Sequence, residues 1–299
     1  MSHLELLQLI LFAFGDDFMS LNKYAIIGFP LGHSMSPFIH RRLFDISGIS
    51  AEYDMLEIRP EELENKFELL RTYSGFNVTI PHKINIIKMC DNTSGVAKLY
   101  SSVNCVKCGD KIIGYNTDAE GFLKTFEHYG VNLFGKVLIL GAGGVARTAL
   151  YECAAKGCRI TIAARESSIT AAKEIAAEAS MKFKGTDISV VLLSELSGEY
   201  DIIINATPVG MYPNIDAMPV QSDVINGCGA VFDLIYNPGE TKLLKTAKEM
   251  GKKAMGGMPM LVWQAAAAHK IWYGADFSCK DINTLIDDSN AYMYKHFRH

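Results

Sequence analysis

The chain has 299 residues, of which 49% are hydrophobic, and its 29 basic and 33 acidic residues give a formal net charge of −4. This length exceeds what one hydrophobic core organises, so we expect two domains, and the hydrophobic content excludes an intrinsically disordered chain. The near balance of charge gives no attraction to nucleic acid or an anionic membrane, so we expect a small-molecule substrate, no nucleic acid, no membrane, and a monomer or homodimer.

Residues 1–21 are expected to form an N-terminal extension that precedes the first domain. The segment 4–18 is apolar, yet it lacks the basic start of a secretory signal, contains Glu5 and Gln8, and is too short to span a bilayer. We therefore predict an additional amphipathic helix that packs on the protein surface or at a subunit contact.

The following segment, up to residue 117, alternates between strand-like and helix-like patterns. Pro37 stands at a natural first-turn position of a helix, Pro81 ends a strand, and Gly109 lies in a tight turn between two strands. These signals predict an α/β domain with a mixed sheet. The expected strands are 23–29, 51–58, 75–80, 102–107 and 111–115, and the expected helices are 36–46, 60–71 and a short one ending at residue 88.

A second α/β pattern follows an expected helix at 118–129. It opens with a continuous apolar strand at 136–140, of the kind found in the centre of parallel sheets. The pattern predicts a Rossmann-type, doubly wound nucleotide-binding domain. Its further elements are expected to be the helices 145–156, 171–178 and 241–250 and the strands 159–163, 200–205 and 230–233.

Two further helices, 260–273 and one from about residue 280, are expected to return to the first domain. We therefore place the substrate-binding domain at residues 22–117 together with about 257–299. The dinucleotide-binding domain is placed at residues 118–256.

A glycine-rich loop connects the apolar strand to the next helix. The loop matches G-x-G-x-x-A in the strand–loop–helix context that gives this motif its meaning. Its first glycine allows a tight turn, its second lets the backbone approach a pyrophosphate, and its alanine allows close packing of helix on strand. The alternative is a turn that serves packing only. The residues expected to bind a cofactor here are Gly141, Ala142, Gly143, Gly144, Val145 and Ala146.

The end of the second strand indicates which dinucleotide is bound. Enzymes that use NAD often place an acidic residue there to hold the ribose hydroxyls, whereas this chain has Arg165. A guanidinium is suited to a 2′-phosphate, so we expect NADP, with NAD possible. Alternatively Arg165 is a solvated surface residue, and the neighbouring Glu166 is able to accept from a ribose.

Several segments combine small, polar and charged residues in the order of a known family signature. The first half of the chain contains GFPLGHSMSPFIH (28–40), NVTIPHK (77–83), VN (103–104) and GYNTDAEGF (114–122). The second half contains NATPVGM (205–211), DLIYNP (233–238) and GMPMLVWQ (257–264). Together these segments resemble the shikimate dehydrogenase family, and the resemblance covers about residues 22 to 280.

The resemblance implies the reversible, NADPH-dependent reduction of 3-dehydroshikimate to shikimate, a step of aromatic amino-acid biosynthesis. It implies that Lys83 and Asp118 are catalytic, and it adds Ala206, Thr207 and Gly257 to the cofactor site. It also implies that the substrate carboxylate and hydroxyls are bound by Ser34, Ser36, Asn77, Thr79, Asn104, Tyr236 and Gln264.

These roles agree with the chemistry of ketone reduction. The reaction needs a hydride from the nicotinamide and a proton for the developing alkoxide, so a general acid must contact that oxygen. The ammonium of Lys83 stabilises negative charge and donates a proton, and Asp118 is suited to orient it. The alternative is that the two side chains form an ordinary ion pair between domains.

Two other functions remain open. One is a dual quinate/shikimate dehydrogenase that uses NAD or NADP, although serine at both 34 and 36 resembles the shikimate-restricted members. The other is a catalytically silent relative that senses the same metabolites, and retention of both Lys83 and Asp118 disfavours it.

The seven cysteines are odd in number and irregularly spaced, which argues against a secreted disulfide framework and favours a reducing cytoplasm. Cys105 and Cys108 match CxxC, but a zinc site needs two more ligands and no second pair exists. We therefore expect no metal and a cytoplasmic enzyme.

Overall fold

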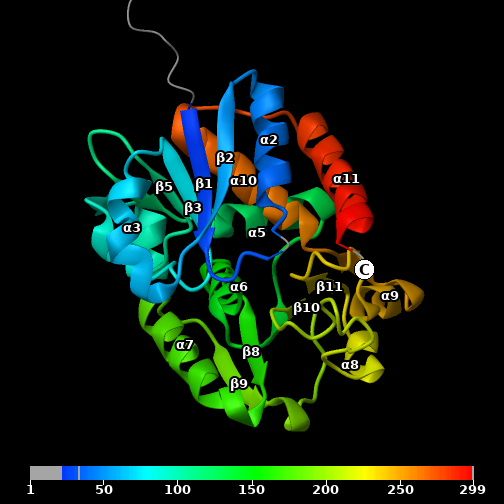
Figure 1. Cartoon of the computed structure of the whole chain (residues 1–299). Coiled ribbons are helices and arrows are strands. Elements are labelled where there is room, and N and C mark those ends of the chain that lie inside the picture. The colour runs from blue at the N-terminus through cyan, green and yellow to red at the C-terminus, as the bar shows by residue number, and fades with distance from the viewer. Residues whose placement is uncertain (1–21, 33, 298–299) are drawn as a thin grey trace, which may run out of the picture.

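The computed structural model describes residues 22–32 and 34–297, and these residues form two α/β domains, each built on a six-stranded sheet. In Figure 1 the first domain occupies the upper half of the molecule and the second the lower half, with helices α5 and α6 near the level where they meet. The predicted N-terminal extension lies outside the described residues. Within the described ranges, no helix combines the length and the apolar character needed to cross a membrane.

The first sheet is mixed, with the strand order β2-β1-β3-β5-β6-β4. Strand β1 pairs in parallel with β2 and β3, whereas β5 runs antiparallel to both β3 and β6. The mixed sheet predicted from the sequence is therefore confirmed. The strands are β1 (Asn22–Gly28), β2 (Ala51–Glu57), β3 (Gly75–Val78), β4 (Asn92–Thr93), β5 (Cys105–Lys107) and β6 (Ile113–Tyr115).

Helices cover both faces of this sheet. Ile27 and Phe76 pack with the helices on one face, while Tyr24 packs on the other face against Phe44 of α2 and Trp272 of α10. Helix α11 then packs on α2 and α10, which confirms that the C-terminal helices return to the first domain. The helices are α2 (Ser36–Ser47), η1 (Pro60–Glu62), α3 (Leu63–Leu70), η2 (Asn85–Met89), α4 (Gly95–Tyr100), α10 (Met258–Tyr273) and α11 (Cys279–His296).

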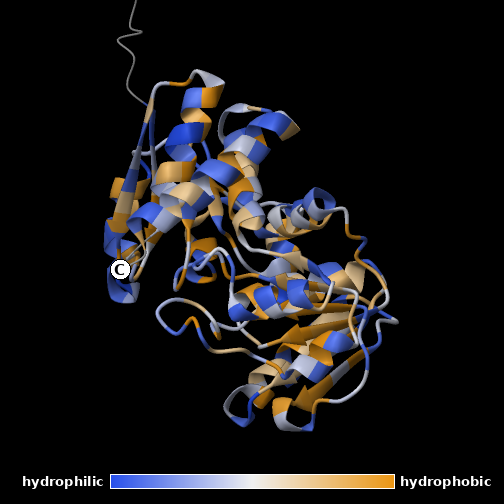
Figure 2. Ribbon diagram, turned by 90° about the vertical axis from the view of Figure 1, so that its right-hand side faces the viewer, coloured by the Kyte–Doolittle hydropathy of each residue, from blue (hydrophilic) through white to orange (hydrophobic). Residues whose placement is uncertain are grey.

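The second sheet is parallel throughout, with the order β12-β11-β10-β7-β8-β9. In Figure 2 its strands are coloured largely orange, which marks hydrophobic residues. Val137 and Ile139 of β7 enter the core on one face and Leu138 and Leu140 the core on the other, which explains its continuous apolar run. The strands are β7 (Lys136–Leu140), β8 (Arg159–Ala164), β9 (Ile188–Leu192), β10 (Ile202–Asn205), β11 (Ala230–Asp233) and β12 (Lys253–Met255).

Helices lie on both sides of the second sheet, as a doubly wound fold requires. The aromatic rings of Phe122 and Phe126 on α5 pack with the first core, and Leu243 and Leu244 on α9 pack with the second. The helices are α5 (Asp118–Tyr129), α6 (Gly144–Ala155), η3 (Glu166–Ser168), α7 (Ile169–Lys182), η4 (Leu193–Glu195), α8 (Ser222–Asn226) and α9 (Lys242–Glu249).

The structure differs from the sequence prediction mainly in short or peripheral elements. Strands β9 and β12 at the edges of the second sheet, and the short elements β4, α4 and α8, were not predicted. Strand β9 is only partly buried, so it lacks a clear apolar alternation. The strand expected at 102–107 begins at Cys105, because Ser101 ends α4 in a left-handed conformation with φ 49°.

Candidate active site

A cavity of about 330 Å³ lies between the two domains. The first domain contributes the segments that follow β1 and β3 and one face of α10, and the second domain contributes the starts of α5 and α6 and the segment after β11. All nine residues to which the sequence analysis gave catalytic or substrate-binding roles lie in its wall: Ser34, Ser36, Asn77, Thr79, Lys83, Asn104, Asp118, Tyr236 and Gln264.

Lys83 and Asp118 form an ion pair at this cavity, with 2.6 Å between Lys83 Nζ and Asp118 Oδ2. Asp118 is the first residue of α5, where the helix dipole favours a carboxylate. Its side chain is 11% exposed and that of Lys83 25% exposed. The pair is therefore shielded from bulk water and still open to a ligand.

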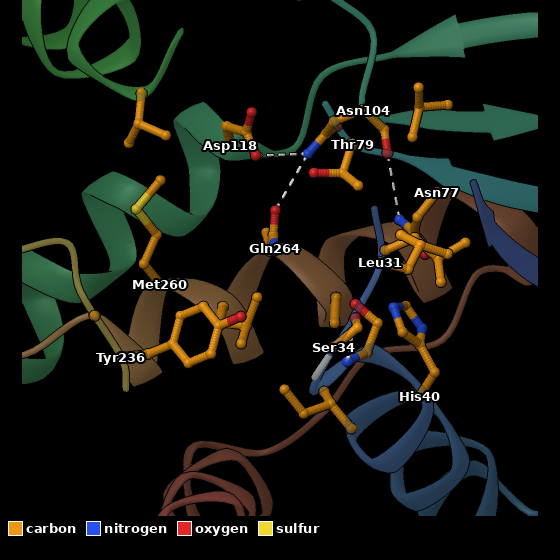
Figure 3. A pocket seen from close by; sticks show the side chains of 18 of the residues that line it. Leu31, Ser34, His40, Asn77, Thr79, Asn104, Asp118, Tyr236, Met260 and Gln264 are labelled. Carbon is orange, nitrogen blue, oxygen red and sulfur yellow. Dashed lines mark hydrogen bonds between the residues drawn. The ribbon is translucent and has the colours of Figure 1, made fainter. Parts of the chain in front are cut away.

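Asn104 holds Asp118 from the other side. Its Nδ2 donates to Asp118 Oδ1 at 2.7 Å and lies 3.3 Å from Gln264 Oε1, as Figure 3 shows. Its Oδ1 accepts from the backbone N–H of Thr117 at 2.7 Å, which fixes the orientation of the amide. The carboxylate of Asp118 thus accepts from an amide at one oxygen and from an ammonium at the other.

Two residues of β2 that the sequence analysis missed support the substrate side of the cavity. The Tyr53 hydroxyl donates to Asn77 Oδ1 at 2.7 Å, and Glu57 Oε1 accepts from the backbone N–H of Leu31 at 2.8 Å. The second contact anchors the loop that carries Ser34. A buried tyrosine and an exposed glutamate in a strand have ordinary structural explanations, so no pattern in the sequence marked them.

Tyr236 reaches the cavity from the second domain. Its segment is held by the buried Asp233, which accepts from the Ile235 N–H at 3.1 Å, from Thr241 Oγ1 at 2.6 Å and from Asn205 Nδ2 at 3.0 Å. Burial raises the pKa of Asp233 to about 6. Burial also raises the pKa of Tyr236, which keeps its hydroxyl as a neutral donor.

A histidine pair lies behind the cavity wall. His40 lines the cavity, and its Nδ1 lies 2.8 Å from Nε2 of His269, a fully buried residue of α10. Burial lowers the pKa of His269 to about 3, and burial together with the neighbouring His269 lowers the pKa of His40 well below its usual range. Both imidazoles are therefore neutral in the folded protein at neutral pH. The sequence analysis did not single out His269, because a histidine in an apolar helix gives no distinct signal.

Lowering the pH should destabilise the fold through these histidines. Between about pH 6.5 and pH 3 the unfolded chain protonates both imidazoles and the folded chain resists protonation, so stability present above pH 6.5 is lost as the pH falls. Urea unfolding at several pH values should show that His269→Gln flattens this dependence relative to the unsubstituted protein. The control variant His128→Gln, at an exposed histidine, should leave the pH dependence of the unfolding free energy unchanged. An unaltered pH dependence in His269→Gln would contradict the role given to His269.

The glycine loop lies beside a second cavity of about 320 Å³. Gly141 has φ +99°, and a Cβ there would lie 2.9 Å from the Thr207 side chain, so the fold itself requires glycine. A Cβ on Gly143 or Gly144, in contrast, would meet no described atom within 4 Å. Glycine at these two positions leaves open space of the kind that a pyrophosphate needs above the loop.

Helix α6 begins at Gly144, and within the described chain no side chain caps its N-terminus. Its first N–H groups are thus available to an anion. Ala146 is fully buried against the second sheet, as expected for close helix–strand packing. Val145 lines the first cavity, so the loop connects the two cavities.

The other residues predicted to bind the cofactor divide between the two cavities. Ala142, Arg165, Ala206 and Thr207 line the second cavity, and Gly257 lines the first. Arg165 follows β8 and is exposed, and no ion pair involving it is found in the described part of the chain. Its guanidinium is available to a ligand.

Comparison with known proteins gives consistent matches. Residues 26–106 match the model of the shikimate dehydrogenase substrate binding domain. The chain is 41% identical to a shikimate dehydrogenase (NADP(+)) of Methanocaldococcus jannaschii over 88% of this chain and 95% of the relative.

Two solved structures extend this similarity to the fold. A shikimate dehydrogenase in complex with NADP+ superposes with a TM-score of 0.82 at 39% identity, covering 90% of this chain and 95% of that one. The enzyme from Thermus thermophilus, in complex with NADP(H) and shikimate, gives 0.80 at 29% identity, covering 90% of this chain and 100% of the other.

Proposed function

The chain belongs to the shikimate dehydrogenase family, and we propose that it catalyses the reversible NADPH-dependent reduction of 3-dehydroshikimate to shikimate. The observation that carries this proposal is the Lys83–Asp118 pair in a cavity that meets a glycine loop. In this scheme residues 22–117 with 257–299 are the substrate-binding domain, and residues 118–256 are the dinucleotide-binding domain.

Bound NADPH would supply the hydride, and the protein supplies the proton and the alignment. Lys83 Nζ donates a proton to the carbonyl oxygen of the substrate as negative charge develops there. Asp118 keeps the ammonium in place. In the reverse direction the neutral amine of Lys83 accepts the hydroxyl proton, and Asp118 stabilises the ammonium that forms. Asn104 fixes Asp118, so the three side chains act as one unit.

The remaining polar side chains of the cavity fit the groups of shikimate. Ser34 and Ser36, on the loop anchored by Glu57, together with Tyr236 from the other domain, are proposed to donate to the carboxylate. These three hydroxyl groups would replace hydrogen bonds that the carboxylate makes with water. The ring hydroxyls are proposed to contact Asn77, Thr79, Asn104 and Gln264.

The cofactor is proposed to lie along the loop 141–146, with Ala206 and Thr207 beside it and Gly257 near the nicotinamide. The open space at Gly143 and the uncapped start of α6 fit a pyrophosphate, and Arg165 fits a 2′-phosphate.

Arg165→Ala should raise the KM for NADP+ by about tenfold or more, because it removes a charge-assisted contact to the phosphate. The KM for NAD+, which lacks that phosphate, should change by less than about twofold. Steady-state kinetics with both cofactors test this. Equal losses would mean that Arg165 only shapes the loop.

We further propose a cytoplasmic location, because all seven cysteines are free thiols and four of them are buried. The Lys83–Asp118 pair argues against a silent metabolite sensor, since sensing needs no proton donor. A dual quinate/shikimate dehydrogenase remains the alternative enzyme.

A further inference from the structure

Four side chains, two of them buried and two half-buried, form a hydrogen-bonded chain that ends at the substrate cavity and has no part in the proposed proton transfer. Ser47 Oγ lies 3.1 Å from the Tyr273 hydroxyl, which contacts Nδ1 of His269. His269 Nε2 in turn lies 2.8 Å from His40 Nδ1. The chain therefore runs from the end of α2, through α10, to the cavity wall.

The hydrogen bonds in this chain have a preferred direction from donor to acceptor. The Ser47 hydroxyl donates to the backbone carbonyl of Leu43 at 2.8 Å, so its oxygen is free to accept from Tyr273. The oxygen of Tyr273 then accepts from His269 Nδ1–H, and His269 Nε2 accepts from His40 Nδ1–H. All the contacts in the chain are satisfied at once.

The opposite direction satisfies fewer contacts. If Tyr273 donated to His269, Ser47 would have to donate to Tyr273, and the bond from Ser47 to the Leu43 carbonyl would be lost. Either direction requires both imidazoles to be neutral. Burial lowers the pKa of both rings and thereby keeps them neutral. The favoured direction leaves His40 Nε2 without a hydrogen.

His40, which carries this nitrogen, is 2% exposed, and the cavity is the described space that it borders. His40 lines the cavity, and its ring stacks on Tyr53 with 4.3 Å between ring centroids. Tyr53 also bonds Asn77, so His40 and Asn77 belong to one wall, and Figure 3 shows them on the side away from Tyr236. Across residues 22–32 and 34–297, no hydrogen bond to His40 Nε2 is found.

We propose that His40 orients the substrate by accepting a hydrogen bond, through Nε2, from a ring hydroxyl of bound shikimate. This inference rests on the proposed function, because it takes shikimate as the ligand. A hydroxyl has the hydrogen that the bare nitrogen needs, whereas a carboxylate has none and would be repelled. His269 and Tyr273 are positioning residues that hold His40 in this tautomer.

Calorimetry with shikimate and with analogues that each lack one of the two non-reacting ring hydroxyls tests the contact. His40→Phe keeps a ring against Tyr53 and should weaken shikimate binding about tenfold, as expected for one lost hydrogen bond. One of the two analogues lacks the hydroxyl that contacts His40. The unsubstituted protein should bind this analogue about tenfold more weakly than it binds shikimate. His40→Phe should bind the analogue no more weakly than it binds shikimate. His269→Phe, which frees the tautomer, should weaken binding by less than His40→Phe does.

Unchanged shikimate affinity in His40→Phe, or equal weakening for shikimate and both analogues, would overturn the proposal. Side-chain ¹⁵N NMR of the unsubstituted protein gives a test that needs no variant: Nε2 of His40 should be the unprotonated nitrogen, and a protonated Nε2 would overturn the tautomer assignment. Binding is measured without turnover. Shikimate that binds and is not oxidised with NADP+ would therefore contradict the proposed function, while the affinities still decide the role of His40.

Discussion

Lys83→Ala should lower kcat by about 10²- to 10⁴-fold, the range expected when a general acid is lost. The ammonium of Lys83 contacts Asp118 Oδ2 and lines the cavity, so it is in a position to donate a proton to a bound substrate. Its removal leaves the polar donors around the substrate in place, and the Kd for shikimate should therefore change by less than about threefold.

Steady-state kinetics and calorimetric binding of shikimate measure both quantities for Lys83→Ala. Lys88→Ala serves as the matched control, because Lys88 is an exposed lysine of the same segment and does not line the cavity. A rise in KM with unchanged kcat would mean that Lys83 binds substrate without taking part in the proton transfer.

Asp118→Asn should lower kcat by about 10²-fold or more, although the side chain keeps its shape. The carboxylate accepts from two donors, Lys83 Nζ and Asn104 Nδ2. An amide has one acceptor oxygen, so its NH₂ group must face one of these donors. Either Lys83 loses its alignment or Asn104 turns away, and the catalytic unit is broken in both cases.

The kinetic constants and the melting temperature of Asp118→Asn should be compared with those of Glu120→Gln. Glu120 lies in the same first turn of α5 but is exposed, so its variant should behave like the unsubstituted protein. An Asp118→Asn variant that retains full kcat would show that Asp118 has only a structural role.

The sequence predicted the central parts of the fold because burial there is complete. The run 136–140 is apolar at nearly every position, since both faces of β7 meet helices. Strand β9, at the edge of the same sheet, is only partly buried, and three-residue β12 is too short to show a period. Their pairing with neighbours is set by tertiary contacts that a local pattern does not contain.

The candidate site was predictable to the extent that its residues lie in contiguous motifs. Lys83 and Asp118 could be named in this way, and the structure brings them within hydrogen-bonding distance although they are far apart in the sequence. Tyr53 and His269 were missed, because each lies in an element where an aromatic residue has an ordinary packing role. Their contacts to Asn77 and His40 depend on how β2 and α10 meet the rest of the domain.

The most direct test of the proposed function is the rate of nicotinamide reduction with shikimate or quinate, each combined with NADP+ or NAD+. The proposed function predicts the highest kcat/KM for shikimate with NADP+. Comparable turnover of quinate would favour the dual enzyme, and a preference for NAD+ would contradict the role of Arg165. Failure to oxidise shikimate with either cofactor, by a protein shown to be folded, would contradict the proposed function.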